Sequence, residues 1–247
     1  QPNIFNQIKK LIIFLQNDIQ QMLPNYEIYT IFDCKEIRLY LYQKKILQFD
    51  QQIIDHLKYS DYFSPELKPL VKEEEFVHKF FYIPNDYETQ RAKGGSGARL
   101  GQIIANDSLE QFISYSKNKD SDFLSKSLRS SQFETNIFLI SNRSFSLIEY
   151  AAINGSAKIF KYLIENKVKI DDSIWLYAIH GKNPEIIHIL EKNQIKPNSY
   201  EELYLESIKC HHNDLAKYIK NKYLADKNDI DISAESIQYY SFEFIQK

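Results

Sequence analysis

Cysteine and histidine are the residues of this chain whose types and spacing could bind a metal. Cys210, His211 and His212 are consecutive, and His180 and His188 precede them. Structural zinc is usually held by four ligands at defined spacing, as paired Cys or as Cys with His. The segment offers a single Cys, and adjacent residues such as Cys210 and His211 cannot share a helical face. The pattern therefore favours a helix end with exposed histidines, and we expect no metal and no other cofactor.

The glycine-rich run Gly94-Gly95-Ser96-Gly97 could cradle a phosphate only in the right context. A P-loop continues with Lys and then Ser or Thr, after a strand and before a helix, and this run does not. Ser, Thr and Cys nucleophiles need a base and an orienting group, and no motif such as a nucleophile elbow indicates them. We therefore expect no catalytic residue, no enzymatic activity and no small-molecule substrate.

The same run is informative about organisation. It holds three of the six glycines of the chain, and its composition is typical of a flexible linker. In so glycine-poor a chain we interpret it as an introduced splice that replaces a deleted loop, with a natural turn as the alternative. Residues 93–97 are thus predicted to separate two parts.

Composition limits the classes of partner. The chain has 247 residues, 43% of them hydrophobic, which is enough for a sizeable core, and its net charge is -2. A basic stripe should accompany nucleic-acid binding. The sequence shows no such stripe, so we expect no nucleic-acid partner. The apolar run 11–15 is too short to cross a bilayer, so we expect no membrane contact. The two cysteines do not form a disulfide framework, which favours a reducing, cytoplasmic location.

The first part, residues 1–92, is predicted to be helical. Apolar residues between positions 8 and 22 recur at spacings of three and four and form one stripe. Asp33 and Asp50 could each begin a further helix. Ser64-Pro65-Glu66 combines a cap residue, a proline at the first helical position and an acid in the first turn.

The second part, residues 98–225, repeats one short apolar block. The block is LEQFI, IFKYL, IIHIL and LAKYI, beginning at residues 109, 159, 186 and 215. Eight residues before each copy stands a small residue, namely Gly101, Ala151, Ala178 and Ser207. A fixed order of small residue, turn and apolar helix is typical of stacked helical pairs. A charged insertion, residues 117–144, separates the first copy from the others, and residues 226–247 are predicted to form a half repeat or cap.

Helix-capping residues support these pairs. Asn106, Ser156 and Asn183 are good caps for the outer helix of successive pairs, and Ser199 with Glu202 has the spacing of a capping box. The predicted fold is therefore all-α, a helical solenoid joined to an N-terminal helical region.

Residues 146–155, SLIEYAAING, resemble the first helix and turn of an ankyrin repeat, and residues 156–164, SAKIFKYLI, resemble its second helix. Later copies keep the small position, but Lys182 and His211 replace the glycine of the turn. The copies are also shorter than the usual period of about 33 residues. The resemblance thus implies an ankyrin-like solenoid whose β-hairpin fingers are trimmed.

A narrower resemblance covers both parts. Residues 37–46, IRLYLYQKKI, and 62–68, YFSPELK, precede divergent repeats. This order is similar to that of the large ankyrin-repeat family of trichomonad parasites, whose N-terminal helical region is a domain of unknown function. The resemblance implies helices stacked on ankyrin repeats and brings no known activity.

Partner-binding positions are expected where the inner helices end. Trp175 and Tyr204 occupy equivalent places, and we expect both in the core, with a ligand-facing aromatic stripe as the alternative. Positions just after the small residues vary freely between copies, as binding or plain surface residues do, and they are Ile153, Asn154, His180, Gly181, Lys209 and Cys210.

The predicted function is a non-catalytic scaffold that binds a partner protein through the inner helices. The alternatives are a substrate adaptor of a ubiquitin-ligase-type assembly, or a secreted parasite effector that acts on a host protein.

Overall fold

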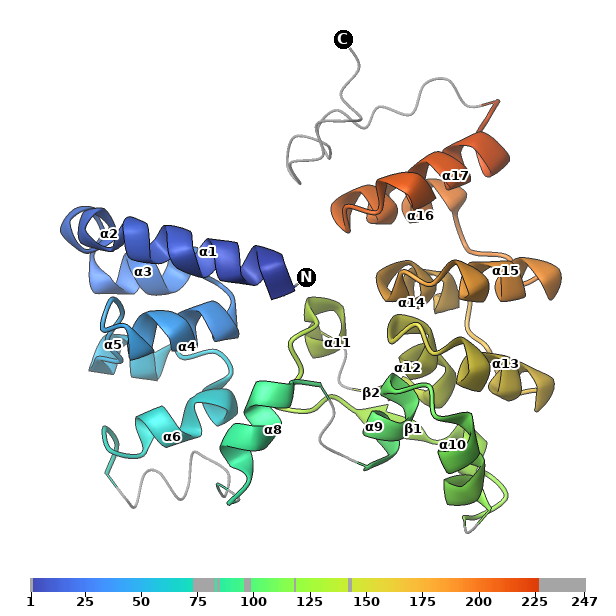
Figure 1. Cartoon of the computed structure of the whole chain (residues 1–247), viewed down its shortest axis with the longest axis horizontal. Helices are drawn as coiled ribbons and strands as arrows, with labels where there is room; N and C mark the ends of the chain where they lie inside the picture. The colour runs from blue at the N-terminus through green and yellow to red at the C-terminus, as the bar shows by residue number, and fades with distance from the viewer. Residues whose placement is uncertain are drawn as a thin grey trace. The chain divides into compact units, whose positions relative to one another are not determined.

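The computed structural model describes residues 2–72, 83, 85–95, 99–117, 119–141 and 144–226. The chain is mostly helical and divides into two compact units (Figure 1). The first unit comprises residues 1–95 and 131–141, and the second comprises 96–130 and 142–247. None of the helices in the described ranges is both long and apolar enough to span a membrane.

The first unit is built from short helices around one core. They are α1 (Pro2–Phe14), α2 (Gln16–Met22), α3 (Asn25–Ile31), α4 (Lys35–Gln43), α5 (Gln51–Asp55), α6 (Ser64–Leu67), α8 (Tyr87–Lys93) and α11 (Ile137–Ser141), with a 3-10 turn, η1 (Ser60–Phe63). Its core contains side chains such as Leu41, Ile53 and Phe63, all 0% exposed.

Two expectations for this unit were wrong. The apolar residues between positions 8 and 22 do not form one buried stripe, since Leu11 is 56% and Met22 78% exposed, and the helix is interrupted at Leu15. Asp33 does not cap α4, whose cap position is Cys34. The Asp33 carboxylate instead pairs with Arg38 at 2.8 Å. The expected start at Asp50 is confirmed, since its side chain accepts a hydrogen bond from the Ile53 N–H at 2.9 Å.

Residues 131–141 differ from the predicted domain boundaries. They lie inside the predicted repeat region 98–225, yet they pack in the first unit. Phe133 is 3% exposed and meets the ring of Tyr87 edge-on at 4.9 Å, and the Lys35 ammonium donates to the Gln132 carbonyl at 2.8 Å. Burial of an aromatic ring therefore returns this segment to the first unit.

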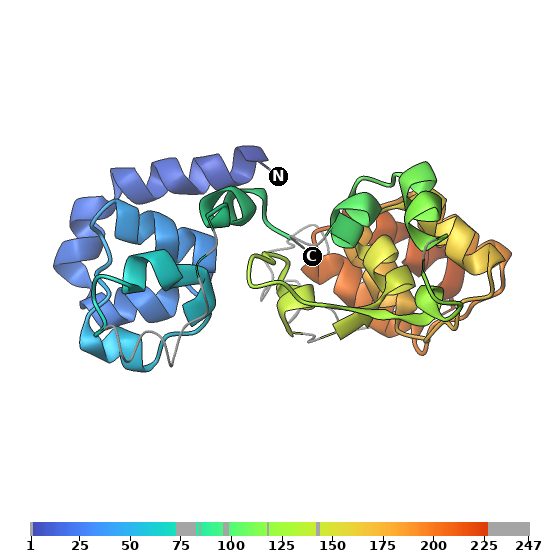
Figure 2. The same ribbon diagram turned by 90° about the horizontal axis from the view of Figure 1, so that it is seen from below.

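The second unit consists of helical pairs. Its elements are α9 (Arg99–Ala105), α10 (Leu109–Ser116), η2 (Phe123–Ser125), β1 (Ser127–Arg129), β2 (Ser144–Ser146), α12 (Leu147–Ile153), α13 (Ala157–Glu165), α14 (Ile174–Gly181), α15 (Pro184–Lys192), α16 (Tyr200–Lys209) and α17 (Asn213–Tyr223). The inner helices α9, α12, α14 and α16 pack on one another in that order, and β1 pairs antiparallel with β2. The pairs lie one above another in Figure 1 and overlap in projection in Figure 2.

The turns between inner and outer helices repeat one backbone conformation. Asp107, Gly155, Lys182 and His211 all adopt a positive φ, between 49° and 69°. In three of the four pairs a residue other than glycine takes this left-handed conformation, which is uncommon for side chains with a Cβ. The packing of each pair therefore outweighs the local cost of its turn.

Turn hydrogen bonds correct the register of the first pair. The Ser156 N–H donates to the Ala151 carbonyl at 2.9 Å, and the Ser108 N–H donates to the Ile103 carbonyl at 3.1 Å. Ile103, and not Gly101, is therefore the counterpart of Ala151. The first copy lies two residues further along the chain than its apolar block predicted.

The helix caps also differ in part from the predicted ones. The full capping box is at Ser146 and Glu149, whereas at Ser199 the side chain accepts from the Glu202 N–H at 3.2 Å without the reciprocal bond. Asn183 caps α15 as expected, but α10 begins after Ser108 rather than after Asn106.

The core of the second unit contains the residues expected there. Trp175 and Tyr204 are each 1% exposed, and the small residues Ala151, Ala178 and Ser207 are at most 1% exposed. The half repeat predicted for residues 226–247 lies outside the described residues except for Asp226.

Candidate functional site

The first two expected binding residues lie at the end of α12 and differ in exposure. Ile153 is 7% exposed, so its side chain belongs to the core and offers little surface to a partner. Asn154 is exposed, and its amide donates to the Tyr150 carbonyl at 2.8 Å. Asn154 thus closes its own helix and remains accessible at the surface.

Gly181, at the end of α14, is held by close packing. A Cβ at this position would lie 2.0 Å from the Ala152 carbonyl oxygen, and a Cβ at Gly155 would lie 2.9 Å from the Gly181 oxygen. The Asn183 side chain donates to the Gly155 carbonyl at 2.6 Å across the same contact. Gly181 therefore lets two consecutive turns touch, which is a packing role.

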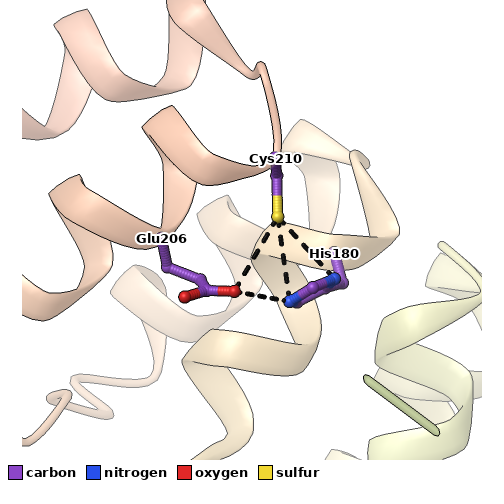
Figure 3. Close-up of side chains that lie close together, drawn as sticks. All are labelled: His180, Glu206 and Cys210. Carbon is purple, nitrogen blue, oxygen red and sulfur yellow. Dashed lines mark hydrogen bonds and ion pairs between the residues drawn. The ribbon is translucent and has the colours of Figure 1, made fainter. Parts of the chain in front are cut away.

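The remaining expected residues meet in one cluster with a residue that the sequence analysis did not include. His180 is the last residue but one of α14. Glu206 lies in the last turn of α16, and Cys210, four residues later, is the cap residue at its end (Figure 3). The His180 Nε2 lies 2.9 Å from Glu206 Oε1. The Cys210 Sγ lies 3.7 Å from His180 Nε2 and 3.9 Å from Glu206 Oε1. We name these three residues the His-Glu-Cys cluster.

Lys209 completes the electrostatics of this cluster. Its ammonium lies 3.4 Å from Glu206 Oε2, and its side chain is 37% exposed. The hydrogen bond with His180 and the charge of Lys209 outweigh burial and hold the pKa of Glu206 below its ordinary value. Glu206 therefore carries a full negative charge at neutral pH.

At neutral pH, Cys210 is a protonated thiol rather than a thiolate. Burial and the nearby negative charge of Glu206 raise its pKa to about 12. Thiolates, not thiols, are the nucleophilic form. The geometry therefore does not activate Cys210 for nucleophilic catalysis.

His212 lies beside the cluster but outside it. Burial, and after it the positive charge of Lys182, lower the pKa of His212 to about 4. The ring is close to the Ile179 backbone, yet neither ring nitrogen reaches a partner with hydrogen-bond geometry among the described residues. His212 is thus a neutral, half-buried imidazole, unlike the exposed histidine predicted for this position.

A pocket of about 720 Å³ opens next to His212, between α15 and α17. Apolar side chains on its wall include Pro184, Ile187 and Leu215, and Tyr218 and Glu191 line it as well. The Tyr218 hydroxyl donates to Glu191 at 2.6 Å. The volume of the pocket falls within the range of ordinary ligand-binding pockets, about 300–1,000 Å³.

Glu206 is the site residue that sequence reasoning missed. Its four-residue spacing to Cys210 places both side chains on one face of α16, and that spacing could have indicated it. The meeting with His180 depends instead on how α16 packs on α14. Together the three side chains offer a nitrogen, an oxygen and a sulfur within 4.8 Å of one another, a set that can hold a divalent cation.

Comparison with known proteins adds one finding. A family described as "Domain of unknown function (DUF3447)" matches residues 165–246, which include α14 to α17 and so the His-Glu-Cys cluster. No curated protein and no solved structure matched the chain.

Proposed function

We propose that the second unit is an ankyrin-like solenoid, related to the trichomonad ankyrin-repeat family, that serves as a non-catalytic scaffold for a partner protein. The observation that carries this proposal is the pocket between α15 and α17, which lies beside the ends of the inner helices. Its apolar wall suits a buried anchor side chain, the feature that dominates many protein interfaces.

The repeated turns support the solenoid part of the proposal. Equivalent residues in four successive pairs adopt the same left-handed backbone, and inner helices pack on their neighbours in chain order. Stacking of one supersecondary unit on the next is what defines a solenoid. Such stacks present extended surfaces to other macromolecules.

The surface beside the pocket indicates the chemistry of the partner. Asn154, Lys182 and His211 are exposed at the ends of successive inner helices, and Lys209 is partly exposed among them; we name these four residues the turn face. Lys182 and His211 also line the pocket. We therefore propose a partner segment with an apolar anchor for the pocket and a carboxylate facing Lys182 and Lys209.

The test is a pull-down with mass spectrometry on a lysate of the source organism and on a host-cell lysate. The pocket variant, Leu215→Glu with His188→Glu, places charge in the hollow, and the turn-face variant is Asn154→Glu with Lys209→Glu. The control, Lys161→Glu, changes an exposed lysine of α13. Circular dichroism verifies that each variant is folded.

The proposal expects a partner that the wild type and the control capture and that the pocket variant loses. Ligase subunits among the captured proteins would identify an adaptor, and capture from the host lysate alone would identify an effector. Capture that neither variant weakens, or no partner in either lysate, would contradict the proposed surface.

A further inference from the structure

We infer that His180, Glu206 and Cys210 form a zinc-binding site that joins α14 to α16, with a fourth coordination position left to water. This inference goes beyond the proposed function and concerns the His-Glu-Cys cluster, which shares only the positioning residue Lys209 with the turn face. It differs from the expectation drawn from the sequence, which considered Cys210, His211 and His212 with His180 and His188, favoured no metal, and left out Glu206.

The spacing of the three ligand atoms fits one tetrahedral ion. With zinc bonds of about 2.0–2.3 Å, the edges between ligand atoms of a tetrahedron are about 3.3–3.6 Å. The observed separations are 2.9 Å between His180 Nε2 and Glu206 Oε1, 3.7 Å between Nε2 and Cys210 Sγ, and 3.9 Å between Oε1 and Sγ. The Sγ also lies 3.7 Å from His180 Nδ1. The His180 ring must therefore rotate to aim the Nε2 lone pair at the point that one ion would share with Sγ and Oε1.

The types of ligand select the metal. A sulfur ligand disfavours Mg²⁺ and Ca²⁺, which prefer oxygen, whereas imidazole, carboxylate and thiolate together suit Zn²⁺. Zinc sites with three protein ligands keep an open position for water. The side chains of His180 and Glu206 are 17% and 19% exposed, so water can reach the cluster.

Lys209 favours monodentate binding of the metal by the Glu206 carboxylate. Its ammonium lies 3.4 Å from Glu206 Oε2, while Oε1 faces His180. Outer groups that hold one ligand atom in this way orient the other toward the metal. Lys209 is therefore a positioning residue of the proposed site.

Binding involves a defined exchange of protons. The Cys210 thiol releases its proton to solvent as the sulfur–zinc bond forms. The neutral imidazole of His180, whose Nε2–H donates to Glu206 Oε1 before the metal binds, moves its proton to Nδ1 so that Nε2 can donate its lone pair to the ion. No oxidant or reductant takes part. Binding should therefore release one proton for each ion and become tighter as the pH rises.

The test uses Co²⁺ in place of Zn²⁺, because cobalt bound to a thiolate gives a charge-transfer absorption that zinc lacks. We expect the full-length reduced protein to bind one equivalent of Co²⁺ with this absorption, and Zn²⁺ to displace it. Cys210→Ser should abolish the band and weaken Zn²⁺ binding, measured by competition with a chelator, by more than about 100-fold.

Cys34→Ser is the matched control, because Cys34 is the second free cysteine and lies in the first unit. It should keep the band. His180→Gln and Glu206→Gln should each reduce affinity, so the inference does not depend on one variant folding. No thiolate band at stoichiometric Co²⁺ in the wild type would overturn the site. A band that Cys34→Ser abolishes and Cys210→Ser keeps would overturn it as well.

Discussion

Gly181 shows how single atoms set the spacing between helical pairs. A Cβ added there would lie 2.0 Å from the Ala152 oxygen, a backbone atom that cannot rotate away. We expect Gly181→Ala to lower the free energy of unfolding by about 3 kcal/mol or more, since overpacking of this kind forces the backbone to move. Urea denaturation measures the loss. Ser114→Ala, at an exposed site on α10, should change stability by less than about 0.5 kcal/mol; equal stabilities for the two variants would disprove the packing role.

The candidate site was predictable only in part at this scale. His180 and Cys210 were both expected at the ends of inner helices, because turn and cap residues mark those ends. Glu206 was not, since its neighbour His180 lies 26 residues away in the chain. Their meeting is decided by the rotation of α16 on α14, and no local pattern reports that rotation. Ile153 was likewise expected at the surface, because it follows the small residues of its inner helix, but the structure buries it.

At the scale of elements, the start of α12 depends on a reciprocal cap. Glu149 accepts hydrogen bonds from the Ser146 N–H at 2.6 Å and from its hydroxyl at 2.8 Å, while Ser146 accepts from the Glu149 N–H. We expect Ser146→Ala to cost about 1–2 kcal/mol of stability, near the upper end for a cap. Thermal unfolding compares it with Ser199→Ala, where only one of the two cap bonds exists. A larger loss in Ser199→Ala would contradict the ranking.

A second element-level prediction concerns the contact between α15 and α17. Burial alone would raise the pKa of Glu191, but hydrogen bonds from Tyr218, Tyr223 and Lys222 outweigh it and hold the pKa below its ordinary value of 4.5. Folding thus favours the charged carboxylate. Its contribution is present above pH 4.5 and is lost as the pH falls through the lowered value.

Glu191→Gln tests this contribution. Wild-type stability, measured by urea unfolding between pH 7 and pH 3, should fall more steeply below pH 4.5 than that of the variant. Glu165→Gln, which changes an exposed carboxylate on α13, should retain the wild-type slope. Parallel pH profiles for the wild type and Glu191→Gln would show that the contact carries no such dependence.

Helices were easiest to predict where caps and apolar spacing agreed. Both signals mark α15, which begins at Pro184 after the cap residue Asn183. The spacing alone misplaced the first copy, because a block of apolar letters still matches when it is shifted by two residues. Only the turn hydrogen bonds of Ser108 and Ser156 define that register. Likewise, the break at Leu15 has no Pro or Gly beside it to announce it.

At the scale of the whole molecule, the chain enters the second unit and then returns to the first. Residues 93–97 are the boundary predicted from the sequence, and the two units divide after Gly95. The placement of residues 131–141 in the first unit could not be predicted, because they carry no helical repeat or cap signal that connects them with residues 1–95. Their placement depends on long-range burial of Phe133 against Tyr87.

Because residues 131–141 pack in the first unit, the stability of that unit depends on Phe133, which follows α9 and α10 of the second unit in the sequence. Phe133→Ala removes a side chain that is 3% exposed and should cost about 3–5 kcal/mol. Hydrogen exchange should then quicken in α8 and leave α14 and α16 protected. Phe123→Ala is the converse control, because this ring is 5% exposed and packs near Phe112 in the second unit. It should quicken exchange in α10 and spare α8. If Phe133→Ala loosened α10 instead, residues 131–141 would belong to the second unit.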